Sequence, residues 1–342
     1  MRHRTLLLTF LTVLVSSLPA QTYYLPRTAL QFHLLIEKQT YTPGRFARYA
    51  ERYLRINGVQ QQEQVTHRII NCELATIGLR DTTKCYTLKL KGKSADSPLQ
   101  LAPDGVILAI NPDTLRQQTF NIIHHPSNIQ HQSSDITHQP SALLSREAIA
   151  ATSNAKTAEI AVQQILDLRE RRQQLSTGEA DDMPQDEQQL RLMLSEIDRC
   201  HNALMTLFTG TVSRDTTLQT LTLCPDRDIE RDVLFRLSHR LGMVDFDDLS
   251  GTPYYISIKN LYPTQPQQPE YKKEDGIFAN VPSMAQVQFY QEDQLLATFE
   301  VPVAQFGYVE MRPADLFKRA PVRMYFHPAT GAIVSQTTDT SE

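Results

Sequence analysis

The side chains best suited to chemistry in this chain are carboxylates that gather between two long helical patterns. They are Glu179, Asp181, Asp182, Asp186 and Glu187. Paired carboxylates can cleave a glycosidic bond, but one member must be desolvated so that its pKa rises. A loop between two helices leaves its carboxylates in water, and the spacing fits a calcium loop poorly. We therefore interpret Glu179, Asp181 and Asp182 as a solvated loop that could contact a partner.

Basic side chains end the first of these helical patterns. Arg169, Arg171 and Arg172 surround Glu170, and cations at a helix C-terminus are favoured by the helix dipole. An alternative is that Arg169 and Arg172 dock an anionic partner, or bind Asp181 and Asp182 across the loop. These arginines and the acidic loop are our candidate contact residues, and we assign no catalytic, cofactor-binding or metal-binding residue.

Other chemical motifs are weaker. A polar stretch contains His124, His125, His131 and His138, whose spacing matches no standard metal site. Ser238 and His239 would point to opposite faces of a strand, and no G-x-S-x-G elbow accompanies them. The chain also lacks a P-loop, a dinucleotide-binding glycine motif and an H-E-x-x-H motif.

The cysteines form no C-x-x-C pair, so a zinc knuckle is not indicated. They are Cys72, Cys85, Cys200 and Cys224. Cys72 and Cys85 fall on two strand-like segments that could face each other, whereas four small buried side chains are the alternative. Their disulfide pairing stays open.

Apolar residues recur at helical spacing on both sides of the acidic loop. Residues 145–175 carry one such stripe, which includes Ile165, and Gly178 suits a helix C-terminus. The second stripe begins near Pro184 and includes Leu194 and Phe208. Two long helices joined by a short loop normally pack antiparallel. We expect a helical hairpin with Ile165 and Leu194 buried in its seam.

The segments outside these helices alternate apolar and polar residues, which predicts β-strands. Residues 65–79 and 84–90 are expected to form a hairpin that turns near Arg80 and Asp81. The fold class we predict is α+β: a β-rich N-terminal part, a long antiparallel helical hairpin and a C-terminal antiparallel β-sandwich-like part. The expected divisions are a signal peptide (1–20), a β-rich domain with one short helix (21–110), a polar linker or long loop (111–142), the hairpin (143–210) and a mostly-β domain (211–342).

The first twenty residues have the pattern of a secretory signal peptide. Arg2 and Arg4 precede an apolar run of about ten residues, and small residues follow, so we expect cleavage after Ala20. The mature chain would start at Gln21 outside the cytoplasm. No later apolar run is long enough for a membrane helix. The net charge of −4 argues against a nucleic-acid partner.

Short motifs along the mature chain resemble one protein family. They are residues 23–26 (YYLP), 41–44 (YTPG), 49–51 (YAE), 151–155 (ATSNA), 169–172 (RERR), 175–179 (LSTGE), 183–184 (MP), 207–210 (LFTG), 234–236 (LFR) and 304–307 (AQFG). In this order they are similar to domain-of-unknown-function family 4831, exported proteins of Bacteroidota. The resemblance implies export and a host of that type, and it supplies no activity, cofactor or catalytic residue.

These features together favour an exported cell-envelope protein without catalysis. We expect a binding or assembly module that needs no cofactor and contacts an envelope protein, located in the periplasm, at the outer membrane or in the medium. The alternative is a periplasmic glycan-processing hydrolase. A pocket holding two carboxylates about 5–10 Å apart would favour the hydrolase, whereas an exposed apolar patch would favour the binding module.

Overall fold

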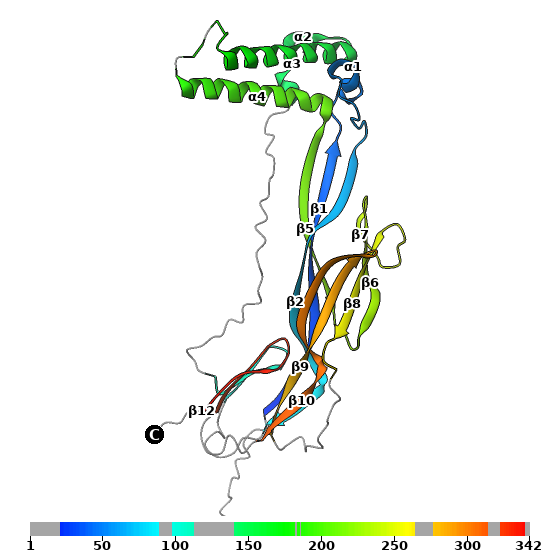
Figure 1. Ribbon diagram of the computed structural model, residues 1–342, viewed down its shortest axis with the longest axis vertical. Helices are drawn as coiled ribbons and strands as arrows, with labels where there is room; N and C mark the ends of the chain where they lie inside the picture. The colour runs from blue at the N-terminus through cyan, green and yellow to red at the C-terminus, as the bar shows by residue number, and fades with distance from the viewer. Residues whose placement is uncertain are drawn as a thin grey trace, which may run out of the picture.

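The computed structural model describes residues 21–88, 98–112, 140–181, 183–184, 186–263, 276–313 and 322–338. Figure 1 shows an elongated arrangement with the helices at one end, a ribbon of long strands through the middle and two further sheets toward the other end. All strand pairs within the three sheets are antiparallel. The described chain is therefore β-rich, with helices that are few and confined to one region.

Strand β1 (Gln21–Thr42) is the centre of a three-stranded sheet. Its neighbours are β2 (Gln64–Leu88) and β5 (Thr211–Leu223), in the order β2-β1-β5. Leu30, Phe32 and Leu34 of β1 are fully buried at alternate positions, as expected for a strand with one face on the core. Pairing between β1 and β5 joins segments that are far apart in the chain.

The hairpin expected near Arg80 and Asp81 is wrong, because β2 continues through these residues as one strand. Pro26 pairs with Arg80 and Tyr24 pairs with Cys85, so residues 81–84 bulge out opposite β1. The Asp81 carboxylate accepts hydrogen bonds from the Thr83 backbone N–H at 2.9 Å and hydroxyl at 2.6 Å. These local bonds satisfy the bulge without reversing the chain.

A five-stranded sheet packs against the β1 sheet. Its order is β10-β9-β8-β6-β7, and its strands are β6 (Ile229–Ser238), β7 (Gly242–Val244), β8 (Thr252–Asn260), β9 (Gly276–Gln291) and β10 (Gln294–Pro313). Phe32 of β1 and Phe289 of β9 have ring centroids 6.5 Å apart in the shared core. The layer that covers this sheet therefore comes largely from β1 and β2, before residue 211. Strands β1 and β5 pair although the predicted division at residue 210 lies between them. The domain divisions themselves stay a prediction.

A smaller four-stranded sheet has the order β12-β11-β4-β3. Its strands are β3 (Leu99–Leu101), β4 (Ile107–Ile110), β11 (Val322–Phe326) and β12 (Ile333–Thr338). Ile107 and Phe326 share a hydrophobic core with Tyr23 of β1 and Ile277 of β9. Burial raises the pKa of Tyr23, whose hydroxyl accepts a hydrogen bond from the Phe278 backbone N–H at 2.8 Å.

The helical end contains two long helices and several short ones. They are η1 (Ala47–Tyr49), α1 (Ala50–Leu54), η3 (Pro140–Leu143), α2 (Arg146–Ala150), α3 (Asn154–Thr177) and α4 (Glu187–Thr209). The helix expected over residues 145–175 is divided at Ala151, which is extended. Ser145 caps α2 and Ser153 caps α3, each through a hydrogen bond to a backbone N–H.

Helices α3 and α4 lie side by side (Figure 1). Ile165 of α3 and Phe208 of α4 are fully buried in a core that also contains Phe46 before η1. Leu194 is half-buried, so the expectation that it is buried in the seam is wrong. The short helices η1 and η3 contact α4, and α1 contacts α3.

Candidate functional site

The arginines proposed as contact residues bind side chains of α4. Arg169 Nε donates to His201 Nε2 at 3.0 Å, and Arg172 Nε lies 2.7 Å from Asp198 Oδ1. Asp198 and His201 were not identified from the sequence. They lie about one turn apart on α4, on the side that meets the arginines of α3. Exposed ion pairs of this kind contribute little to stability.

The acidic loop is solvated in the part that the structure describes. Glu179 and Asp181 are exposed, and Glu179 Oε2 accepts a hydrogen bond from the Thr177 hydroxyl at 3.1 Å. Asp182 lies outside the described residues. The structure thus places Arg172 on Asp198 and leaves Glu179 and Asp181 in water, where they stay candidates for contact with a partner.

A different surface stands out on the five-stranded sheet. Leu241, Phe246 and Leu249 are 68%, 70% and 83% exposed, and they lie on either side of the short edge strand β7. Phe246 and Leu249 share the loop between β7 and β8, and we name these two side chains the apolar tip. In Figure 1 the loop between β7 and β8 projects outward from the edge of the sheet. Large apolar side chains this exposed commonly mark a binding surface when they occur together.

Hydrogen bonds hold the loop that carries Phe246 and Leu249. Arg236 Nε donates to the Phe246 carbonyl at 2.7 Å, and its Nη1 donates to the Gly251 carbonyl at 3.1 Å. Asp248 Oδ1 accepts from the Ser250 backbone N–H at 2.9 Å, and this bond keeps the pKa of Asp248 below its ordinary value. The guanidinium therefore fixes both ends of the loop, and the apolar tip is displayed on an ordered backbone.

The apolar tip was missed at the level of sequence. Its signal is the placement of Phe246 and Leu249 among Asp245, Asp247 and Asp248, in a stretch that ends with Ser250 and Gly251. Turn residues on both sides indicate a surface loop, and a phenylalanine in such a loop is unusual enough to suggest contact with a partner.

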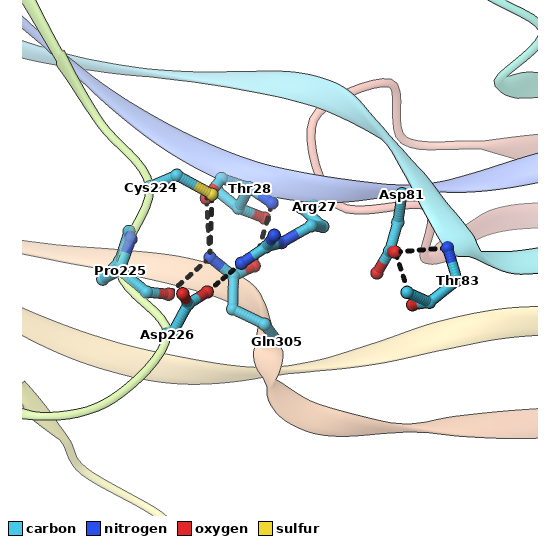
Figure 2. Close-up of polar contacts among 8 residues, drawn as sticks. All are labelled: Arg27, Thr28, Asp81, Thr83, Cys224, Pro225, Asp226 and Gln305. Atoms are coloured by element: carbon cyan, nitrogen blue, oxygen red, sulfur yellow. Dashed lines mark hydrogen bonds and ion pairs between the residues drawn. The ribbon is translucent and has the colours of Figure 1, made fainter.

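Polar side chains gather around the buried Thr28, where β1 meets β10 and the β5–β6 connection (Figure 2). The Gln305 amide accepts from the Thr28 backbone N–H at 2.9 Å and donates to the Thr28 and Pro225 carbonyls, both at 2.8 Å. Arg27 forms an ion pair with Asp226 beside it. Because both ends of the Gln305 amide are bonded to backbone, this junction joins strands and leaves its polar groups satisfied.

The described residues contain no group of three or more histidine, cysteine or acidic side chains that could hold a metal ion. The four histidines in residues 111–142 lie outside the described residues. A depression of about 250 Å³ lies against α3 and α4, and it contains a single carboxylate, Asp167, near Arg171 and Cys200. The paired carboxylates needed for glycoside cleavage do not meet in this depression.

All four cysteines are free and half-buried. Cys72 and Cys85 cannot face each other from neighbouring strands, because both lie on β2, opposite Leu34 and Tyr24 of β1. Burial raises the pKa of the Cys72 thiol to about 12, so this side chain is a neutral thiol at physiological pH.

Comparison with known families matches residues 20–334 to a family described as a domain of unknown function, DUF4831. The chain belongs to the DUF4831 family. Neither the curated proteins nor the solved structures contain a match to this DUF4831 protein. Within the described residues of the DUF4831 chain, every helix is too short or too polar to cross a membrane.

Two motifs of the DUF4831 resemblance meet where the helices join the sheet. One motif is residues 41–44 and the other is residues 207–210. The Tyr41 hydroxyl of the first donates to the Thr209 carbonyl of the second at 3.0 Å. A Cβ on Gly44 would collide with the Leu207 backbone, and Gly210 has φ 78° with Tyr41 and Thr42 against it. These glycines permit the close approach of two backbones, so this part of the resemblance concerns architecture.

Proposed function

We propose that this chain is an exported cell-envelope protein that binds or assembles with a partner through surface contacts. The apolar tip carries the proposal. Phe246 and Leu249 are held in water by a loop that Arg236 fixes at both ends, so little conformational entropy is lost when a partner covers them. Covering apolar surface stabilises a complex by about 25 cal/mol per Å² before the costs of association.

The residues around the apolar tip suggest the chemistry of the partner. Asp245, Asp247 and Asp248 are exposed beside Phe246 and Leu249. A complementary surface would have an apolar groove bordered by lysine or arginine side chains. Anionic lipid headgroups would be repelled by the same carboxylates, which favours a protein partner.

Export is part of the proposal. The signal-peptide pattern ends at Ala20, and β1 begins at Gln21 with Tyr23 already fully buried. We propose a Bacteroidota host and a location in the periplasm, at the outer membrane or in the medium. N-terminal sequencing of protein from envelope fractions should find a chain that starts near Gln21, whereas an intact Met1 in the cytoplasm would contradict export.

We propose that α3 and α4 act as a helical hairpin that offers a second contact surface. The contacts of Arg169 with His201 and of Arg172 with Asp198 run in opposite chain directions, which supports an antiparallel pair. The acidic loop at its end, with Glu179, would then be available to the same partner or to another one.

The experiment compares capture of envelope proteins by purified variants after crosslinking. Replacing both Phe246 and Leu249 by Ser should reduce capture of a specific partner by about tenfold or more, because central apolar contacts carry most interface energy. Leu192→Ser is the matched control, since Leu192 is 70% exposed on α4. Both variants should keep the thermal stability of the parent protein.

Two outcomes would contradict the binding proposal. The first is equal capture by the tip variant and the Leu192 control, which would show that the apolar tip contacts nothing. The second is hydrolysis of envelope glycans by the purified chain, which would favour the hydrolase. A Glu179→Gln and Asp181→Asn double variant in the same assay tests the acidic loop separately.

A further inference from the structure

A lysine reaches a buried asparagine at the junction between the β1 sheet and the five-stranded sheet. Lys84 lies in the bulge of β2, and its Nζ is 3.2 Å from Oδ1 of Asn280 on β9. Asn280 is 1% exposed, and its Nδ2 donates to the carbonyls of Pro26 at 2.9 Å and Thr330 at 2.8 Å. These bonds fix the amide so that its carbon stays close to the lysine.

The surroundings favour the nucleophilic form of this lysine. Burial lowers the pKa of Lys84, and the neighbouring Arg27 lowers it further, whereas the Asp81 carboxylate opposes both effects. A lysine with a lowered pKa has a larger fraction of neutral amine, which carries the reactive lone pair. Asp81 is itself buried, at 7% exposed, on the same bulge. A carboxylate beside an amine can accept a proton and pass it on.

We propose that Lys84 and Asn280 become joined by an intramolecular isopeptide bond. The neutral Nζ of Lys84 attacks Cγ of Asn280, and a C–N bond forms while the bond from Cγ to Nδ2 breaks. One proton leaves Nζ, with Asp81 as the neighbouring carboxylate that can accept it, and Nδ2 takes up one proton and leaves as ammonia. The product is a neutral secondary amide, and the reaction requires no oxidant, reductant or further reactant.

This bond would tie β2 covalently to β9, and so would join two sheets that otherwise meet through side-chain packing and hydrogen bonds. The connected residues are 196 positions apart in the chain. A crosslink over a separation of this length strongly restricts the unfolded chain and thereby stabilises the folded one. The inference is independent of the apolar tip and of the proposed binding function.

The test is mass spectrometry of the mature protein and of its proteolytic peptides. The intact mass should be lower than the sequence mass by one ammonia, and a branched peptide should connect residue 84 to residue 280. An N-terminal glutamine can also lose ammonia by cyclising, so the peptide map decides where the loss occurred. Separate, unmodified peptides for residues 84 and 280 in the parent protein would overturn the proposal, whether or not any variant folds.

Variants identify the roles of the three side chains. Lys84→Met should abolish the branched peptide, and Asp81→Asn should abolish or slow its formation in protein that is still folded by circular dichroism. Lys38→Met is the matched control, because Lys38 is exposed on β1, and it should retain the branched peptide. A branched peptide that persists in folded Asp81→Asn protein at the parental level would overturn the proton-transfer role of Asp81.

Discussion

The hydroxyl of Thr28 provides a direct test of how the junction is held together. This side chain is fully buried on β1, where it donates to the Ala329 carbonyl at 3.0 Å and accepts from the Ala304 backbone N–H at 3.0 Å. Thr28→Val keeps the shape of the side chain and removes only the hydroxyl. No cavity is created, so the effect reports the two hydrogen bonds.

The magnitude follows from the two groups that lose their partner. Ala304 and Ala329 are 1% and 4% exposed, so water cannot replace the hydroxyl without local rearrangement. Each buried, unsatisfied backbone group costs about 1–3 kcal/mol, which gives about 2–6 kcal/mol for Thr28→Val. Thr28→Ser retains the hydroxyl and loses one methyl group, and should cost about 1 kcal/mol.

Urea denaturation followed by far-ultraviolet circular dichroism is the appropriate assay, since the chain contains no tryptophan. The matched control is Thr217→Val on β5, where the threonine is exposed. This control should stay within about 0.5 kcal/mol of the parent protein. If Thr28→Val and Thr217→Val shift the transition equally, at unchanged slope, the reasoning about the buried hydroxyl is refuted.

Two further predictions concern the helical end and the four-stranded sheet. Ile165→Ala should destabilise the protein by about 2–5 kcal/mol, because Ile165 is fully buried. Leu192→Ala should cost less than about 0.5 kcal/mol, because Leu192 is exposed. Equal urea midpoints for the two variants would contradict the packing of α3 on α4. Burial lowers the pKa of His327 from 6.5, so the unfolded chain binds this proton more readily and stability should fall as pH drops below about 6.5. The fall should be smaller in His327→Gln, and parallel pH profiles would exclude this contribution.

Local sequence patterns predicted the helices and strands that form because neighbouring residues bury one apolar face. The apolar spacing around Ile165 predicted α3, because a helix that buries one face must repeat its apolar residues at helical intervals. Gly178 ends that helix with φ 77°, as its type and position indicated. The alternation in β1 followed in the same way from burial of one face of a strand. The family was also recognised, since short motifs in a fixed order are visible without a structure.

Long-range contacts explain what the sequence left undecided. Periodicity shows which face of a strand is buried and is silent about which strand lies beside it, so pairing of β1 with β5 could not be inferred. The turn expected at Asp81 became a bulge because β1 offers hydrogen-bond partners on both sides of it. Arg172 forms an ion pair with Asp198 because α4 packs against α3, and the sequence did not show that ion-pair partner.

The candidate site is also among the features that long-range contacts decide. Phe246 and Leu249 are visible in the sequence as apolar residues in a turn-rich loop, but their display in water depends on Arg236 reaching two carbonyl groups. Lys84 and Asn280 lie in segments with no sequence relation to each other, and the approach of β2 to β9 brings them together. Composition and periodicity determined that the chain forms helices and antiparallel strands, because each element buries one apolar face. Tertiary structure alone decided which side chains meet, because that depends on how those faces stack.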